Sequence, residues 1–183
     1  MSSNKLTLIG GSVRSGKSAF ALALARKAGG RRVFIATAEG GDAGMRARIA
    51  RHREERGGAF ETVEEPLDLL GALERARGAG CVVVDCLTLW VANLLLKGES
   101  EETAAGRVEG VRAFLAGRPF QAILVTNEVG MGVVPENALA RAFRDACGRA
   151  HQAFSREADE VYFAALGVML RLKPGPVEAV EGP

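Results

Sequence analysis

Eight consecutive residues near the start of the chain have the types and spacing of a phosphate-binding loop. They match the pattern G-x-x-x-x-G-K-S and are Gly11, Ser12, Val13, Arg14, Ser15, Gly16, Lys17 and Ser18. In such a loop the glycines allow a tight turn, and several backbone N–H groups point inward at phosphate oxygens. The lysine reaches the β- and γ-phosphates, and the hydroxyl after it ligates Mg²⁺. The segment therefore predicts binding of a nucleoside triphosphate.

A carboxylate that completes the magnesium site is expected at the carboxyl end of a neighbouring strand. Asp85 ends the apolar run Cys81–Asp85 and fits this role. The alternative is that Asp85 only caps the helix that follows, which is a common use of aspartate.

The chain has two histidines, His52 and His151. His52 stands in an arginine-rich segment, residues 45–56, in which helical spacing puts it on one face with Met45 and Ile49. In one interpretation this is a solvated helix with a packed histidine. In the other, a neutral imidazole attacks phosphorus while arginines neutralise charge. Spacing alone leaves both open, and we predict a structural role for His151.

Short apolar runs alternate with longer segments of helical periodicity, a pattern typical of parallel strands joined by crossover helices. Unbroken apolar runs predict strands that are covered on both faces. A last run, Val168–Lys173, predicts an antiparallel edge hairpin, so the expected class is α/β, a P-loop-type mostly parallel sheet flanked by helices on both faces. The predicted strands are Leu6–Gly10, Val33–Thr37, Cys81–Asp85, Ala122–Thr126 and Val161–Ala165, and the predicted helices are Lys17–Lys27, Asp42–Arg56, Pro66–Arg77, Leu87–Lys97, Glu101–Leu115 and Pro135–Ala158.

Length and composition limit the classes of function. At 183 residues, 48% hydrophobic and 25% charged, the chain predicts one nucleotide-binding domain over residues 1–183, with about 174–183 a frayed tail. A formal net charge of +2 gives no overall field for nucleic acid. We expect no membrane span, no secretion signal and a cytoplasmic location. Cys81, Cys86 and Cys147 lack the paired spacing of a zinc or redox site, which predicts reduced thiols.

Several segments together resemble the bifunctional adenosylcobinamide kinase/adenosylcobinamide-phosphate guanylyltransferases of cobalamin synthesis. The similarity runs in order from about Leu6 to Lys173, and the segments are Gly10–Ser18, Ile35–Ala38, Arg48–Arg53, Val84–Trp90 and Thr126–Glu136. The resemblance implies two reactions on a corrinoid substrate. ATP or GTP phosphorylates the aminopropanol hydroxyl of adenosylcobinamide. GMP from GTP is then joined to that phosphate, giving adenosylcobinamide-GDP and pyrophosphate.

The resemblance also implies the roles of individual residues. His52 would carry the guanylyl group as a phosphoramidate, Lys17 would be the second catalytic residue, and Ser18 and Asp85 would hold Mg²⁺. Some relatives have a histidine pair where this chain has Arg51 and His52. A homotrimer is implied as well. Besides the phosphate loop, the implied nucleotide contacts are Ala36, Thr37, Ala38, Arg53, Glu54, Glu55, Arg56, Glu64 and Asp85.

Two other functions use the same loop. One is a small-molecule kinase without guanylyl transfer, in which His52 would be replaceable. The other is a non-catalytic nucleotide sensor whose helices bind a partner. No residue is an obvious base for the substrate hydroxyl, although phosphoryl transfer proceeds largely by positioning and charge stabilisation. The segment Asn127–Gly132 predicts either a substrate or nucleotide contact or a turn that caps the sheet.

Overall fold

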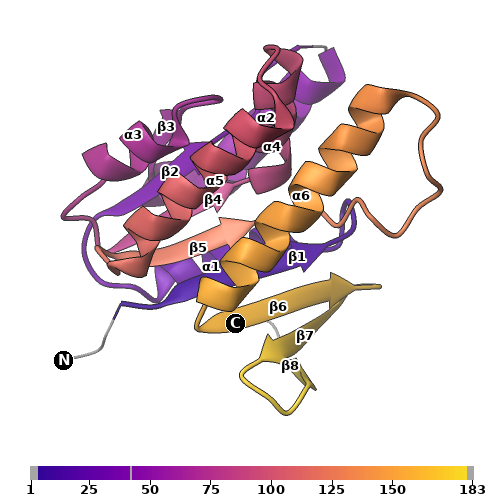
Figure 1. Cartoon of the computed structure of the whole chain (residues 1–183). Coiled ribbons are helices and arrows are strands. Elements are labelled where there is room, and N and C mark those ends of the chain that lie inside the picture. The colour runs from indigo at the N-terminus through magenta and orange to yellow at the C-terminus, as the bar shows by residue number, and fades with distance from the viewer. Residues whose placement is uncertain (1–3, 42, 181–183) are drawn as a thin grey trace.

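A computed structural model of the chain describes residues 4–41 and 43–180, without the side chains of Met45, Arg48, His52 and Glu55. The described strands form one sheet in the order β3-β2-β4-β5-β1-β6-β7-β8 (Figure 1). The strands from β1 to β6 pair in parallel, and β7 and β8 pair antiparallel, which confirms the predicted class. Their bounds are β1 (Leu6–Gly11), β2 (Arg32–Ala36), β3 (Glu61–Glu64), β4 (Cys81–Asp85), β5 (Gln121–Val125), β6 (Glu160–Ala165), β7 (Val168–Lys173) and β8 (Glu178–Val180).

The helices follow the predicted order, and capping side chains decide several of their starts. The prediction that Pro135 lies in the first turn of the last helix is wrong. Asn137 caps that helix instead, because its Oδ1 accepts a hydrogen bond from the Ala140 N–H at 2.7 Å. No helix within the described ranges is long and apolar enough to cross a membrane. The helices are α1 (Lys17–Arg26), α2 (Ala43–Arg56), α3 (Leu69–Arg75), α4 (Leu87–Leu96), α5 (Glu101–Ala116) and α6 (Ala138–Glu157), with a short 3-10 turn at Gly57–Ala59.

Helices cover both faces of the sheet, which explains the unbroken apolar strands. Alternate residues of a strand point to opposite faces. In β4, Val82 and Val84 pack in the core formed with α3, α4, α5 and α6. Cys81 and Val83 pack in a second core, formed with α1. Both faces are therefore buried, and no polar alternation is possible in the central strands.

Two short strands, β3 and β8, were not predicted from the sequence. β3 has the polar sequence Glu-Thr-Val-Glu and pairs only with β2, at one edge of the sheet. β8 lies in the segment that was predicted to be a frayed tail, and it pairs with β7 from Met169 to Arg171. An ion pair of 2.6 Å between Arg171 and Glu178 supports this pairing. The prediction of fraying is thus wrong for residues 178–180, while residues 181–183 lie outside the described part.

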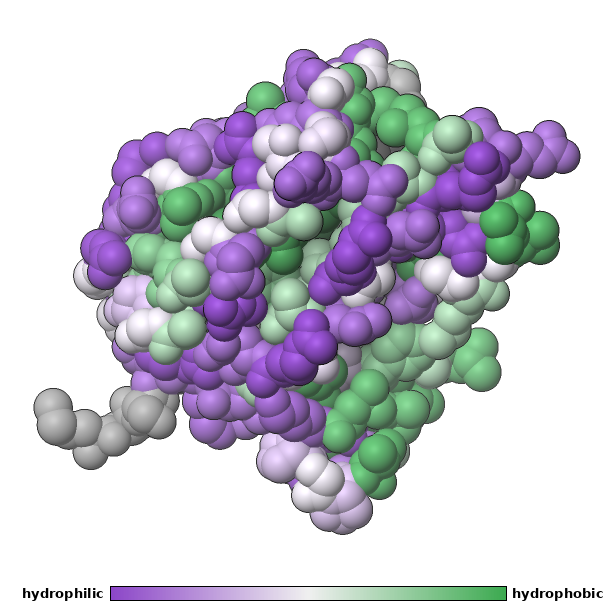
Figure 2. Space-filling model, viewed as in Figure 1, coloured by the Kyte–Doolittle hydropathy of each residue, from purple (hydrophilic) through white to green (hydrophobic). Residues whose placement is uncertain are grey.

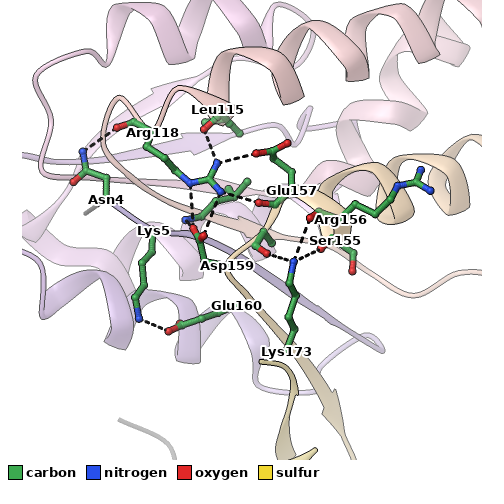
Figure 3. A network of polar contacts seen from close by, with 12 residues as sticks. Asn4, Lys5, Leu115, Arg118, Ser155, Arg156, Glu157, Asp159, Glu160 and Lys173 are labelled. Carbon is green, nitrogen blue, oxygen red and sulfur yellow. Dashed lines mark hydrogen bonds and ion pairs between the residues drawn. The ribbon is translucent and has the colours of Figure 1, made fainter. Parts of the chain in front are cut away.

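A polar network fastens the amino-terminal edge of the sheet (Figure 3). The Arg118 guanidinium donates to Glu157 at 3.2 Å and to Asp159 at 3.1 Å. Asp159 also accepts the Leu6 N–H at 2.8 Å. Burial acts to raise the pKa of Asp159, but the Leu6 N–H and Arg118 outweigh it and the pKa is lowered. This network joins α6 to the start of β1, at the edge opposite the phosphate loop.

Candidate functional site

The parallel sheet brings the predicted site segments to one edge. The phosphate loop follows β1, Thr37 follows β2, and Asn127 follows β5. Glu64 and Asp85 are the last residues of β3 and β4. Parallel strands end on the same side, so all five segments lie along the carboxyl edge, where open α/β sheets bind ligands.

The strand order corrects one expectation about Asp85. Its strand, β4, is not adjacent to β1, because β5 pairs with both and lies between them. Asn127 and Glu128, which follow β5, therefore come between the phosphate loop and Asp85. The Glu128 N–H donates to the Gly11 carbonyl at 3.0 Å and ties this segment to the loop.

The phosphate loop has the backbone that its glycines predict. Gly16 has a φ of 90° and leads directly into α1. A Cβ on Gly11 would lie 2.6 Å from the Ala164 carbonyl oxygen, so β6 leaves room only for glycine. Lys17 is buried, and its Nζ donates to the Ser12 carbonyl at 2.9 Å, across the loop. The lysine is thus held where the loop would place phosphate.

A basic cleft of about 700 Å³ separates the phosphate loop from α2. Arg14 and Lys17 line it from the loop, and Arg51 lines it from α2, together with Gly44 and Ala47. The loop N–H groups and the N-terminus of α1 add positive partial charge. The cleft therefore suits a chain of phosphates.

Thr37 joins the ends of β2 and β4. Its Oγ1 accepts the Cys86 N–H at 2.8 Å and donates to the Cys86 carbonyl at 2.8 Å. The residue is fully buried, and the Asn93 side chain donates to its carbonyl. The Thr37 hydroxyl thus positions the chain next to Asp85 in this structure, and its nucleotide contact stays a prediction.

Asp85 lies next to a buried thiol. Burial, with a smaller contribution from the Asp85 carboxylate, raises the pKa of Cys86 to about 11, while Lys17 acts to lower it. Lys17 and Asp85 are therefore both close to Cys86. Burial likewise raises the pKa of Cys81 and of Cys147 to about 12 each, so the three thiols are protonated at neutral pH.

Asn127 and Thr88 form a polar contact, of which only Asn127 was predicted from the sequence to lie at the site. The Asn127 N–H and Nδ2 both donate to Thr88 Oγ1, at 3.0 and 3.1 Å. Asn127 Oδ1 is buried and has no hydrogen-bond partner in the described structure. A buried acceptor of this kind is costly unless a ligand or water donates to it. Asn127 belonged to a predicted contact segment, whereas Thr88 lay in the family-like segment Val84–Trp90 but had no role predicted for it.

The C-terminal half of α2 is attached to the far edge of the sheet. Arg53 donates to Glu64 at 2.8 Å, and both side chains are exposed. Because Glu64 is the last residue of β3, this ion pair links α2 to the edge strand. Arg56 is 4% exposed, with its guanidinium 4.1 Å above the Phe34 ring, so this predicted nucleotide contact is a packed residue here.

Other predicted residues are placed only by their backbone or lie at the surface. His52 and Glu55 belong to α2, and their side chains are outside the described set. His52 is adjacent in the chain to Arg51, which lines the basic cleft, and to Arg53. Ala36 ends β2. Ala38 follows Thr37, and Glu54 is exposed on α2.

His151 is half-buried against the carboxyl end of β5. Its Nε2 lies 2.7 Å from Thr126 Oγ1, and its Nδ1 lies 3.8 Å from a carboxylate oxygen of Glu128. Burial lowers the pKa of His151, and Glu128 offsets this only in part. The neutral ring therefore positions Thr126 and Glu128, in line with the predicted structural role.

We predict that His151 makes stability pH-dependent. Because its pKa is lower in the folded chain than the ordinary value of about 6.5, the unfolded chain binds the proton first as the pH falls. Stability is fully present above pH about 6.5 and declines below it, by at most about 1.4 kcal/mol per pH unit for one proton. Urea unfolding of the wild type and of His151→Gln at several pH values measures this. An equal decline in both would contradict the assignment.

Comparison with known proteins identifies the family to which the chain belongs. Residues 7–172 match the model of the family described as cobinamide kinase / cobinamide phosphate guanyltransferase. The chain belongs to this family. It is 43% identical to the bifunctional adenosylcobalamin biosynthesis protein CobP of Pseudomonas aeruginosa, over 93% of this chain and 98% of the relative. It is 37% identical to the corresponding CobU protein of Salmonella typhimurium, over 92% and 99%.

Members of the cobinamide kinase/guanyltransferase family are enzymes that combine a kinase with a nucleotidyltransferase, in cobalamin biosynthesis. More distant solved structures share the fold alone. A KaiC-like protein of Pyrococcus horikoshii has a TM-score of 0.50 at 18% identity, covering 96% of this chain and 76% of that one. The RadB recombinase has a TM-score of 0.52 at 16% identity, covering 98% and 83%. Both therefore share the arrangement of strands and helices described above.

Proposed function

We propose that this enzyme phosphorylates adenosylcobinamide with ATP or GTP, and then transfers GMP from GTP to the product through a guanylyl group on His52. One observation carries the proposal: α2, which contains His52, faces the phosphate loop across a basic cleft lined by Lys17 and Arg51. Because the chain belongs to the cobinamide kinase/guanyltransferase family, we assign the nucleotide to the loop and the nucleophile to the facing helix.

The residues present fit a magnesium ion. Ser18 and Asp85 supply a hydroxyl and a carboxylate, the hard oxygen ligands that Mg²⁺ prefers, and both belong to the carboxyl edge of the sheet. When bound there, Mg²⁺ would neutralise charge on the phosphates. Asn127 Oδ1, unpartnered between the loop and Asp85, provides an acceptor for a substrate hydroxyl or a water at this place.

In the guanylyl transfer, a ring nitrogen of His52 attacks the α-phosphorus of GTP in line. A nitrogen–phosphorus bond forms as the bond from the α-phosphorus to the bridging oxygen of pyrophosphate breaks. Lys17 and the loop N–H groups stabilise the negative charge that pyrophosphate carries away. A phosphate oxygen of adenosylcobinamide phosphate then displaces the histidine, which returns as a free imidazole.

The test is to incubate the protein with Mg²⁺ and GTP labelled at either the α- or the γ-phosphate. We expect acid-labile, alkali-stable label on the protein from the α position only, because a phosphoramidate hydrolyses in acid. Covalent γ-label would indicate a phosphorylated enzyme and contradict the mechanism. Tight GTP binding without covalent label would favour a kinase without guanylyl transfer, and negligible turnover with either nucleotide would favour a sensor.

The homotrimer that the family resemblance implies stays a prediction. Sedimentation equilibrium of the full chain, with and without GTP, would measure the assembly directly.

A further inference from the structure

A second cleft borders the phosphate loop. It measures about 780 Å³ and lies between α1 and the strands β7 and β8. Ser15, Gly16 and Ala19 line both this cleft and the basic cleft toward α2, so the loop and the first turn of α1 form the wall between them. Both volumes fall within the range of small-molecule sites, roughly 300–1,000 Å³. A ligand held on the loop can therefore extend to either side.

The second cleft has an apolar lining. Ala19 and Ala23 contribute from α1, and Val168 and Met169 contribute from β7. None of the lining residues in the described part of the chain carries a charge or a side-chain amide. Such a lining suits the flat face of a base and is unsuited to phosphate. On the opposite face of the molecule, which carries α5 and α6, Figure 2 also shows hydrophobic surface over the hairpin of β7 and β8, at the lower right.

Each phosphate of a bound triphosphate contacts a different group of the loop, and this order determines on which side of the loop the nucleoside lies. Lys17 serves the β- and γ-phosphates, and the N–H groups of the loop and of the first helical turn cradle the α- and β-phosphates. The nucleoside is attached to the α-phosphate, so it emerges beside the first turn of α1. Ala19 belongs to that turn and borders both clefts, whereas the next residue, Phe20, and Ala23 one turn further on line the second cleft and not the basic cleft.

A buried hydroxyl marks the point where the cleft meets the loop. Ser15 is 9% exposed, and its Oγ has no hydrogen-bond partner in the described structure. Because an unpaired buried hydroxyl is costly, a ligand oxygen at this position would restore the missing contact.

We propose that this apolar cleft binds the nucleobase of the triphosphate used in the kinase step. The guanine of the guanylyl donor would bind elsewhere, near Glu64, a nucleotide contact implied by the family resemblance whose carboxylate can accept hydrogen bonds from guanine N1–H and N2–H. The inference rests on the proposed kinase function of the loop. Glu64 ends β3, four strands from β1, which is roughly 19 Å at about 4.8 Å per strand. The apolar cleft borders the loop itself. The kinase nucleotide and the guanylyl donor thus direct their bases to opposite sides of the loop.

Base selectivity in the kinase step follows from the lining. A site whose only polar side chain is the Ser15 hydroxyl, next to the phosphates, has no amide or carboxylate to read the edge of a base and discriminates weakly between bases, whereas an amide or carboxylate aimed at that edge discriminates strongly. We therefore expect the dissociation constants of ATP and GTP at this cleft to agree within about tenfold. The guanylyl step, with Glu64 available, would remain selective for guanine.

Filling the cleft from both walls tests the proposal. Ala23→Phe narrows it from α1, and Val168→Trp narrows it from β7. Each should weaken binding of ATP in the presence of Mg²⁺ by about tenfold or more, while tripolyphosphate, which has no base, binds within about twofold of its wild-type affinity. Ala113→Phe, on an exposed face of α5, is the matched control and should change neither affinity. Photolabelling by 8-azido-ATP should map to α1 or to β7 and β8.

Three results would overturn the proposal. They are unchanged ATP affinity in both cleft variants, a parallel loss of tripolyphosphate binding, or photolabel confined to residues 37–64. The covalent α-label from GTP is measured on the same proteins. Its absence would contradict guanylyl transfer but would leave the assignment of the nucleobase to the apolar cleft unchanged. Failure of the wild type to bind ATP would contradict both the kinase function and the cleft assignment.

Discussion

Replacing His52 by alanine is expected to abolish guanylyl transfer and to leave the phosphorylation of adenosylcobinamide nearly unchanged. The imidazole is the nucleophile of the transferase step only, so its removal takes away the covalent pathway, with an expected loss of about 10³-fold or more. Phosphoryl transfer goes directly from the nucleotide to the corrinoid hydroxyl and needs no protein nucleophile. Release of pyrophosphate and formation of phosphorylated adenosylcobinamide, measured separately, give the two rates.

The other histidine provides the matched control. His151→Gln removes an imidazole that contacts Thr126 and Glu128, and should keep the covalent α-label. His52→Gly with free imidazole in solution adds a second measurement, because imidazole in the vacated space would accept GMP as a small-molecule phosphoramidate. Undiminished α-label in His52→Ala would assign the nucleophile to a different residue.

Replacing Lys17 by methionine should lower both activities by about 10²–10³-fold each, which corresponds to the loss of one preorganised electrostatic contact to the reacting phosphates. The ammonium is buried within the loop and is held 2.9 Å from the Ser12 carbonyl. Stability should change little, because Ser12 is exposed and water can replace the lost donor. Steady-state kinetics of both reactions, with urea unfolding of each protein, measure these effects.

Lys27→Met, just beyond the C-terminal end of α1, is the control for the loss of one positive charge. It should retain both activities because its side chain is exposed and lies ten residues along the chain from Lys17. A kinase rate within about tenfold of wild type in Lys17→Met would mean that the lysine does not contact the transferred phosphate. A loss confined to one reaction would mean that the two steps use different phosphate sites.

The chemistry of the phosphate loop could be predicted from the sequence because it is local. Gly11, Gly16 and Lys17 lie within one loop of seven residues. Their order determines the conformation of this loop and the residue at which α1 begins. Strands β4 and β7 were predicted with the observed bounds, because glycine, aspartate or proline residues border their apolar runs. β3 and β8 were not, since their short polar sequences become strands only by pairing with β2 and β7.

The sequence by itself determined which groups are available: a triphosphate loop, a carboxylate at a strand end and a histidine among arginines. Tertiary structure decided which of these groups meet. It placed β5 between β1 and β4, engaged the Thr37 hydroxyl with Cys86, and packed Arg56 on Phe34. It also opened an apolar cleft beside the loop from residues about 150 positions apart, such as Ala19 and Val168. Strand order and burial depend on contacts between distant segments, which no local pattern of residues specifies.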